Sequence, residues 1–339
     1  MVINLDYNKF VSEKICIGNQ SLNQKKNILL CGDSKYIKYV GVTLTSIAVN
    51  NSSSSLAFHI ICDDIEKTDL DKLEKVNQLY GCTIIIYKLD TALIKDLAKS
   101  VNKDSHVNVA GLFRLIGFCI IPDEIENVLY MDSDILVTGK LDDFYDTTLS
   151  DKEVAIVVED LESEMHQKEI GVPNYFNSGV MYVNIRLWKD LNLLEKCLEI
   201  MFSGKKYRFV DQDVLNIVLQ NKTKFFPNKF NFMYRLNHTF SEKNFSEDYP
   251  VIWHFIGISK PWHSWTQEFT IVKRYNSIVK NSYWYDNRII TINDIKDLKT
   301  KYKVYKIISR GCKKKGNISG YFINTLKYCV AKFKHNIVN

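Results

Sequence analysis

Several common signatures are missing from this chain of 339 residues, and each absence excludes a class of protein. The longest apolar stretch, residues 107–121, is interrupted by Asn108, Gly111 and Arg114. It therefore falls short of the roughly 20 apolar residues that a membrane-spanning helix needs, and no transmembrane anchor is expected. The first ten residues include acidic and polar residues and contain no apolar run long enough for a signal peptide, so we expect neither a signal peptide nor export.

The eight cysteines form no CxxC pair and no Cys/His cluster at the spacing of a zinc site, which argues against a zinc module. They are scattered singly through apolar or mixed surroundings. We expect reduced, mostly buried thiols and a protein of the reducing cytoplasm.

The chain also lacks a GxGxxG loop and a Walker loop, which disfavours the usual dinucleotide and ATP phosphate sites. It has no internal repeat at the periods of solenoid proteins and no real low-complexity tract. An apolar fraction of 46% and a charged fraction of 25% are ordinary for a globular protein.

The net charge of +6 is unevenly distributed. Residues 296–339 contain twelve Lys and Arg but one acidic residue, a net charge of +11, so the rest of the chain carries −5. Such a basic tail suits nucleic acid or an anionic membrane, and the alternative is a solvated helical face.

Short apolar runs alternate with amphipathic runs. We expect strands at residues 27–31, 56–62, 83–87, 127–131, 154–158, 179–183 and 251–255, and helices at residues 36–49, 66–79, 107–119, 186–201 and 211–219. This alternation predicts an α/β domain with a largely parallel sheet and helices on both faces. From about residue 261, short aromatic and basic segments predict a separate C-terminal region.

Asp132 and Asp134 directly follow the apolar run 127–131. A buried parallel strand delivers the polar side chains after it to the carboxyl edge of the sheet, where open α/β folds bind ligands. Two carboxylates that converge there repel each other, and a hard divalent cation relieves the repulsion. The pattern predicts a metal site, and the alternative is a turn that one aspartate caps.

A second polar group accompanies the apolar run 251–255. His254 can supply a nitrogen ligand to the same metal, Gly257 lets the backbone approach a phosphate, and Lys260 offers a compact positive charge to a diphosphate. A lone histidine at a strand end is more often a core or surface residue, so this group gains weight only beside the other motifs.

Two more motifs are polar. One is Asn177-Ser178-Gly179, and the other, Asp211-Gln212-Asp213, lies in the first turn of the predicted helix 211–219. Acidic residues are favoured in a first turn, so capping is the alternative for one aspartate but does not account for the whole set.

The segment Gly32-Asp33-Ser34-Lys35-Tyr36 follows the first predicted strand. In a doubly wound fold this loop faces the nucleotide crevice. There Asp33 can accept a hydrogen bond from a base imide, and Tyr36 can stack on the base.

In chain order, CGDSKY, AGLFRL, LYMDSD, FNSGV, VDQDVLN and HFIGISKPWH resemble the motif series of glycosyltransferase family 8. That family includes bacterial lipopolysaccharide galactosyl- and glucosyltransferases and, more distantly, glycogenin. The resemblance is specific because all six motifs occur in the family's order, and not because of any one motif. The resemblance implies a GT-A fold for residues 27–265, an N-terminal extension at 1–26, and a basic, mainly helical C-terminal extension at 266–339 of the kind typical of lipopolysaccharide core enzymes.

The resemblance also implies roles for matching residues. Mn²⁺ or Mg²⁺ would be held by Asp132, Asp134 and His254 with the donor diphosphate. The donor nucleotide would be bound by Asp33, Ser34, Tyr36, Asp132, Ser133, Gly257 and Lys260, with Asp33 and Tyr36 at the uracil and Gly257 and Lys260 at the phosphates. The catalytic candidates around the donor hexose are Arg114, Asn177, Asp211 and Gln212, with Asp160 a weaker candidate. Lys35 departs from a related galactosyltransferase, which has Asn near the ribose.

The implied activity is transfer of glucose or galactose from UDP-glucose or UDP-galactose, with retention and in α linkage, to the lipopolysaccharide outer core. Negative charge grows on the diphosphate as UDP leaves, and a cation with Lys260 stabilises it. A two-step route needs a nucleophile, and by resemblance only Gln212 occupies its position. An amide is a poor nucleophile, so we favour front-face substitution, in which a UDP oxygen helps deprotonate the acceptor hydroxyl.

The basic tail fits an acceptor that is a growing glycolipid. Tyr321, Phe322, Leu326, Val330 and Phe333 recur at helix-like intervals, which predicts an interfacial amphipathic helix. We therefore expect an anionic inner-membrane surface as a partner, and a peripheral protein on its cytoplasmic face.

Two alternatives stay open at this point. A metal-dependent nucleotidyltransferase or phosphohydrolase could use Asp132 and Asp134, but it leaves the motifs around Asn177 and Gln212 without a role. A non-catalytic binding protein for nucleic acid is suggested by the tail alone, and we expect no nucleic-acid partner because the basic residues are confined to one end of an otherwise acidic chain.

Overall fold

The computed structural model describes residues 7–19, 25–51, 55–101, 109–160, 164–205, 207–237 and 249–338. The chain divides into two units. Met1–Phe232 and Pro250–Ile252 form the first unit, and Met233–Tyr249 and Trp253–Asn339 form the second. The first two residues of the predicted helix 107–119 lie outside the described residues.

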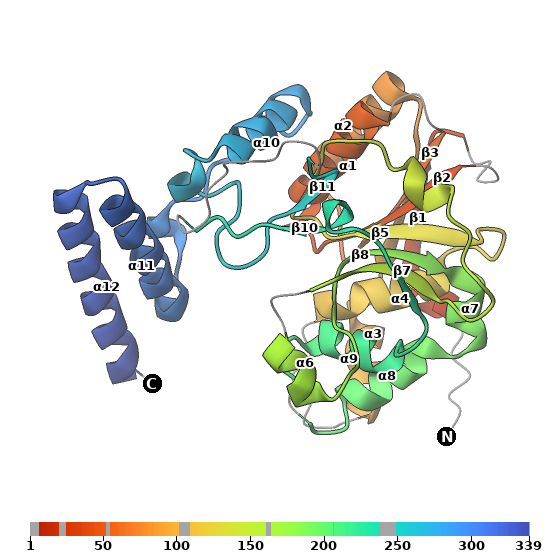
Figure 1. The fold of residues 1–339 in the computed structure, drawn as a ribbon. Helices are drawn as coiled ribbons and strands as arrows, with labels where there is room; N and C mark the ends of the chain where they lie inside the picture. Colours follow the sequence, from red (N-terminus) through yellow and green to blue (C-terminus); the bar gives the residue numbers. More distant parts are fainter. Residues whose placement is uncertain are drawn as a thin grey trace. The chain divides into compact units, whose positions relative to one another are not determined.

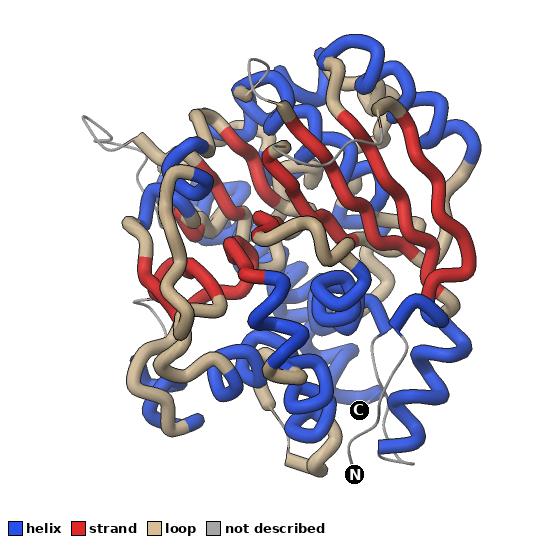
Figure 2. Tube along the Cα trace, turned by 90° about the vertical axis from the view of Figure 1, so that its right-hand side faces the viewer, coloured by secondary structure: helices blue, strands red, loops and turns tan. Residues whose placement is uncertain are grey.

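An eight-stranded sheet forms the centre of the first unit. In order across the sheet, its strands are β1 (Val11–Ile17), β4 (Thr83–Leu89), β3 (Leu56–Cys62), β2 (Lys26–Cys31), β5 (Asn127–Met131), β8 (Phe176–Asn184), β7 (Ala155–Glu159) and β9 (Thr223–Phe225). The run β4-β3-β2-β5 is parallel, as is the pair β7-β9. β1 and β8 are antiparallel to their neighbours. Figure 2 shows the strands in red, running next to one another across the sheet.

Helices cover both faces of this sheet (Figure 1). α1 (Ile37–Asn50) and α2 (Lys67–Tyr80) lie on one face. The other face carries α3 (Thr91–Val101), α4 (Phe113–Ile120), α7 (Ile185–Asp190), α8 (Leu193–Met201) and α9 (Val210–Val218). The shorter α5 (Asp142–Tyr145) and α6 (Glu164–Ile170) lie between strands along the chain. The predicted α/β architecture is confirmed.

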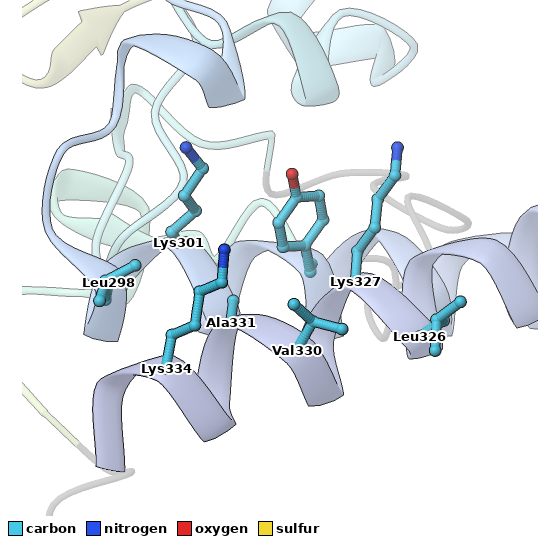
Figure 3. Close-up of a pocket in the computed structure, with 8 residues that line it drawn as sticks. Leu298, Lys301, Leu326, Lys327, Val330, Ala331 and Lys334 are labelled. Carbon is cyan, nitrogen blue, oxygen red and sulfur yellow. The ribbon is translucent and has the colours of Figure 1, made fainter. Parts of the chain in front are cut away.

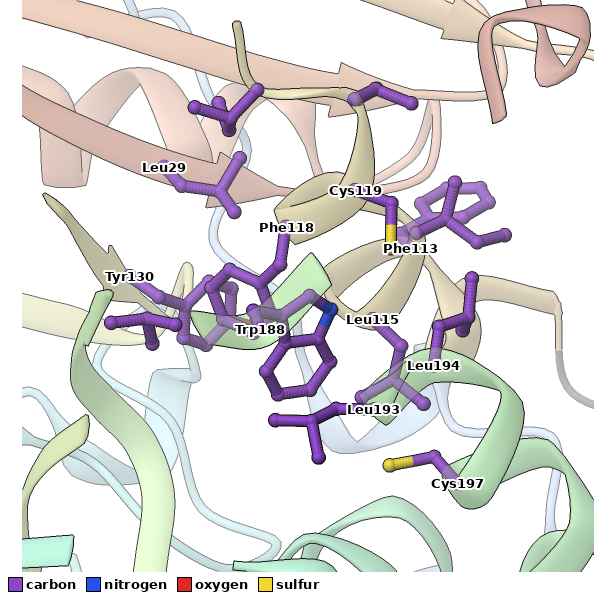
Figure 4. Packing of buried hydrophobic residues seen from close by; sticks show 14 of the residues in the cluster. Leu29, Phe113, Leu115, Phe118, Cys119, Tyr130, Trp188, Leu193, Leu194 and Cys197 are labelled. Carbon is purple, nitrogen blue, oxygen red and sulfur yellow. The ribbon is translucent and has the colours of Figure 1, made fainter. Parts of the chain in front are cut away.

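The main apolar core lies between the sheet and α4, α7, α8 and α9 (Figure 4). Phe118 packs against Trp188 with ring centroids 4.7 Å apart. Gly117 lets α4 approach the sheet closely, because a Cβ there would lie 3.1 Å from the Leu29 side chain. This packing fixes the position of α4, which carries Arg114 at its second residue.

Three details differ from the prediction. β1 lies within residues 1–26, where no strand was expected, and it joins the sheet edge beside β4. The predicted helix 186–201 is wrong as one helix: α7 and α8 are separated at Asn192, whose φ of 49° is left-handed, a conformation that asparagine tolerates. The predicted helix 107–119 is a 3₁₀ turn, Val109–Leu112, followed by α4.

A small three-stranded sheet, in the order β10-β11-β6, accompanies the large one. Its strands are β6 (Ile135–Val137), β10 (Phe232–Met233) and β11 (Ile252–His254). The second unit contains α10 (Thr270–Asn281) and two long helices, α11 (Leu298–Lys314) and α12 (Ile318–Val338). An aromatic core around Tyr275 includes Phe255 and Trp262.

Within the described residues, no helix is long and apolar enough to cross a membrane. All eight cysteines are free thiols. Cys62, Cys82, Cys119 and Cys197 are buried, and burial raises the pKa of each thiol.

Candidate active site

Two loops of the predicted site lie at the same edge of the sheet. β2 and β5 are parallel neighbours, so the residues that follow them emerge side by side. Asp33 to Tyr36 follow β2, and Asp132 to Asp134 follow β5. Burial raises the pKa of Tyr36, and the negative charges of Asp134 and Asp33 raise it further, as expected for neighbouring loops.

Helix α1 holds the turn from Asp132 to Asp134 in place. The hydroxyl of Thr43, which is fully buried, donates to the carbonyl oxygens of Ser133 and Ile135 at 3.0 Å each. The backbone N–H of Asp132 donates to the carbonyl of Gly179 on β8 at 2.9 Å. The two carboxylates therefore project from a backbone that is fixed at both sides.

Arg114 joins three of the predicted motifs. Its guanidinium forms ion pairs with Asp132 and Asp211 at 3.1 Å each, and it donates to the Ser178 carbonyl at 2.9 Å. Burial disfavours the charge of Arg114, but the carboxylates outweigh this effect and its pKa is raised. Tyr130 donates to the same Oδ1 of Asp132 at 2.5 Å. Asp132 is thus held by two donors as well as by its backbone.

The side-chain amide of Gln212 is bonded at both ends. Its Oε1 accepts from the Asn177 side chain and from the Ser178 backbone N–H, both at 3.1 Å. Its Nε2 donates to the hydroxyl of Tyr175 at 2.8 Å. The oxygen of the amide meets only donors, and its nitrogen meets an acceptor. The network therefore fixes which way the amide points.

Asp213, the third residue of the Asp-Gln-Asp motif, is fully buried. Its carboxylate accepts from the Tyr175 hydroxyl at 2.6 Å, contacts Nε2 of His166 at 2.8 Å, and accepts from the backbone N–H of Phe209 at 2.9 Å. Burial and the bond to Asp213 raise the pKa of Tyr175, so its hydroxyl keeps its proton. Asp213 therefore supports Tyr175, which in turn holds Gln212.

His166 and Tyr175 could not be predicted as members of this network, because neither lies in a recognisable motif. Their contacts with Asp213 join positions 47 and 38 residues apart. Asp160, the weaker candidate, donates its backbone N–H to the Tyr175 carbonyl at 2.8 Å, so it lies beside this network.

Asn177 is nearly buried and uses both ends of its amide within the protein. Its Oδ1 accepts from the backbone N–H of Gly179 and from the side chain of Asn231, both at 3.0 Å, while its Nδ2 donates to Gln212. The structure therefore places Asn177 as a support for Gln212.

In the loop after β2, Asp33 closes the turn that starts α1. Its Oδ1 accepts from the backbone N–H groups of Lys35 and Tyr36 at 3.1 Å each. The backbone N–H of Ser34 donates to Asp63 at 2.6 Å. Tyr36 is 44% exposed, so its ring is accessible for stacking.

In the second unit, His254 is buried at the end of β11, and the residues after it form a tightly bonded loop. Gly257 has a φ of 85°, which favours glycine. The ammonium group of Lys260 donates to the Phe255 carbonyl at 2.6 Å. The N–H of Lys260 donates to Nδ1 of His263, whose pKa is lowered to about 4 by burial and by the charge of Lys260.

Asp132, Asp134 and His254 form a group of possible metal ligands. One ligand atom of each lies within 4.8 Å of the others. Two carboxylate oxygens and one imidazole nitrogen are donors that suit Mn²⁺ and, with further oxygen ligands, Mg²⁺. The donor set fits a divalent cation.

The fold has a close counterpart among solved structures. The galactosyltransferase LgtC, in complex with donor and acceptor sugar analogues, aligns with a TM-score of 0.62 and 21% identity, over 76% of this chain and 96% of that one. This likeness shows a GT-A fold, so the predicted fold class is confirmed.

Sequence similarity narrows this class. A lipopolysaccharide 1,2-glucosyltransferase of Escherichia coli K12 is 30% identical over 85% of this chain and 87% of its own length. A lipopolysaccharide 1,3-galactosyltransferase of Salmonella typhimurium LT2 is 28% identical over 93% of this chain and 92% of its own. The profile of glycosyl transferase family 8 matches residues 27–266, and the chain belongs to that family. The predicted resemblance is confirmed.

Proposed function

We propose that the chain is a retaining hexosyltransferase that moves glucose or galactose from its UDP-sugar, in α linkage, onto the outer core of lipopolysaccharide. Family membership and the names of both curated relatives support the reaction and the acceptor class. The observation that carries the proposal is the convergence of Asp132, Asp134 and His254. We propose residues 27–265 as the catalytic domain, residues 1–26 as an N-terminal extension, and residues 266–339 as the region associated with membrane and acceptor.

The three convergent side chains would hold Mn²⁺ or Mg²⁺. Once bound, such a cation neutralises the charge that develops on a departing diphosphate. Asp132 is oriented for this role by Tyr130 and Arg114. Lys260 would bind the same diphosphate once it exchanged the Phe255 carbonyl for a phosphate oxygen.

The uridine would lie over the loop after β2. The exposed ring of Tyr36 offers a stacking surface. Asp33 keeps Oδ1 in the turn, so its Oδ2 would accept from the base imide. Ser34 and Ser133 lie in the two adjacent loops at this edge, and Gly257 supplies a backbone position without a side chain for the phosphates.

Around the sugar, Arg114, Asn177, Asp211 and Gln212 form one bonded group. The Oε1 of Gln212 already accepts two hydrogen bonds at 3.1 Å, so its lone pairs are engaged. This arrangement suits an amide that positions the sugar, and it supports front-face substitution over a covalent intermediate. Trapping a glycosyl adduct on Gln212 would overturn that choice.

The direct test measures UDP release from a panel of UDP-sugars with Mn²⁺, with and without truncated core lipopolysaccharide. Release that depends on UDP-glucose or UDP-galactose and on the acceptor is expected. Pyrophosphate or inorganic phosphate as the product would favour a nucleotidyltransferase or phosphohydrolase instead. No acceptor-dependent release with any UDP-hexose would reject the proposal.

For the location, we propose peripheral attachment to the anionic cytoplasmic face of the inner membrane, with no nucleic-acid partner. The net charge of +11 in residues 296–339 supports this location. Basic residues near an anionic surface contribute about 1 kcal/mol each.

A further inference from the structure

The last two helices form an antiparallel pair with a defined turn. Gly316 has a φ of 71°, and the side chain of Asn317 accepts from the Gly320 N–H at 2.8 Å to begin α12. The hydroxyls of Ser309 and Thr325 share a hydrogen bond of 2.7 Å across the helix pair, close to the buried Gly311. The pair is thus held by its own contacts.

α12 exposes an apolar stripe. The side chains of the stripe are spaced three or four residues apart, so they share one face of the helix. Each is between 47% and 69% exposed. The stripe consists of Ile318, Phe322, Leu326, Val330, Phe333 and Ile337. An exposed apolar surface of this extent on a protein marks an interaction site.

A pocket of about 320 Å³ opens between α11 and α12 and is continuous with this stripe through Leu326 and Val330. We call it the lysine pocket. Its lining consists of Leu298, Lys301, Tyr305, Leu326, Lys327, Val330, Ala331 and Lys334. Figure 3 shows Lys301, Lys327 and Lys334 extending to the same side, with Val330 and Ala331 between them. The pocket therefore has an apolar floor and a cationic rim.

The two helices that carry the three ammonium groups supply no carboxylate to balance them. Neither α11 nor α12 contains an acidic residue. Among the described residues, no carboxylate lies within 4.0 Å of Lys301, Lys327 or Lys334; Lys327 instead lies 5.9 Å from the ring centroid of Tyr305. Like charges gathered over an apolar floor favour the binding of an anion.

We propose that the lysine pocket binds the phosphate group of an anionic phospholipid in a bilayer, while the apolar stripe inserts among the acyl chains. A lipid phosphate matches the rim, and its hydrocarbon matches the floor and the stripe. A nucleic acid or a free phosphate would leave the stripe in water. A second copy would bring together two tails of +11 each, which repel each other.

The inference refines the proposed membrane attachment and does not require sugar transfer. In the test, the full-length protein is sedimented with phosphatidylcholine vesicles that contain or lack phosphatidylglycerol. The pocket variant is Lys301→Gln/Lys327→Gln/Lys334→Gln. Its matched control, Lys299→Gln/Lys303→Gln/Lys314→Gln, removes the same charge from exposed positions on the other side of α11.

Loss of surface charge alone lowers the partitioning of the protein onto anionic vesicles by about fivefold per lysine. This loss is the same for both triple variants. A pocket adds a specific loss, so we expect the pocket variant to bind phosphatidylglycerol vesicles at least about tenfold more weakly than the control. Equal losses in the two variants, or no loss in either, overturn the proposal. So does retention on DNA that depends on the pocket lysines while vesicle binding does not.

A second variant guards against misfolding of the triple variant. Val330→Asp places a carboxylate three residues after Lys327 and four before Lys334, where it pairs with both. Because Val330 is 47% exposed, the helix should tolerate the change, as circular dichroism will show. The preference for phosphatidylglycerol should fall as in the pocket variant, and an unchanged preference would refute the site. Binding of UDP in the presence of Mn²⁺, which we assign to residues 27–265, should be unchanged in all variants, and this separates the proposal from the proposed reaction.

Discussion

The side-chain nitrogen of Gln212 donates a hydrogen bond to the hydroxyl of Tyr175 at 2.8 Å. Tyr175 in turn donates to Asp213, which His166 contacts from the other side. The chain of contacts extends from a surface helix to the residue that the family resemblance places beside the donor sugar. Orientation of Gln212 thus depends on residues that do not themselves reach the site.

Tyr175→Phe removes the acceptor for Gln212 and the donor to Asp213 without changing the ring. We expect kcat to fall about 30-fold, since each of the two lost bonds costs roughly 1 kcal/mol, while the KM for the donor changes little. Steady-state UDP release measures both constants.

The matched control is Tyr145→Phe, which removes the 3.0 Å bond to the Asn27 carbonyl far from Gln212. It should lower the melting temperature while leaving kcat unchanged. If both variants lower kcat equally, the effect is one of stability and not of orientation.

Arg114→Lys retains one positive charge but loses the planar fork that reaches Asp132, Asp211 and Ser178 together. We expect kcat/KM to fall by about 100-fold, because two carboxylates lose a charge-assisted partner. Arg186→Lys is the control, since Arg186 forms an exposed pair with Asp190. An Arg114→Lys enzyme with wild-type kcat/KM would show that the bidentate contacts are dispensable.

A chelator should abolish UDP release, and added Mn²⁺ should restore it. Asp134→Asn removes a charged ligand, so Mn²⁺ affinity should fall by at least the roughly 10–100-fold that loss of a supporting hydrogen bond costs a metal site. Electron paramagnetic resonance of free Mn²⁺ measures this affinity without any assay of activity. The exposed Asp143→Asn serves as the control, and equal Mn²⁺ binding by both variants would count against the site.

His59 predicts a loss of stability in acid. It is fully buried between Asn27 and Tyr87, and burial, with the charge of Lys14, lowers its pKa to about 3. The unfolded chain binds this proton near pH 6.5, so between pH 6.5 and 3 the unfolded state holds more protons and stability falls as the pH falls.

From pH 7 to pH 5 this histidine alone should cost about 2 kcal/mol of unfolding free energy. Denaturant unfolding at the two pH values measures the change. His59→Gln should reduce the difference by that amount, whereas His335→Gln in α12 should not. An undiminished difference in the His59 variant would assign acid sensitivity to other groups.

Much of the fold could be predicted because its signals are local. Hydrophobic periodicity predicts β2, β3 and β5 and the helices between them along the chain. The break at Asn192 was missed because the apolar pattern continues across it, and only the left-handed backbone shows the end of α7. β1 was missed because it pairs with β4, more than 65 residues away.

Part of the candidate site could also be predicted from the sequence. Asp132 and Asp134 come directly after an apolar strand, and the adjacent parallel strand brings Asp33 to the same edge. The end of a strand determines where the next side chains emerge from the sheet. Residue type and strand order were therefore sufficient to predict where these aspartates lie.

By itself, the sequence determined the alternation of strands and helices, the ordered motifs and the basic tail, because these depend on neighbours along the chain. Only the tertiary structure decided that Arg114 bridges Asp132 and Asp211, and that His166 and Tyr175 meet at a buried Asp213. Packing of α4, α6 and α9 brings these groups together, and no local pattern encodes contacts between segments so distant in sequence.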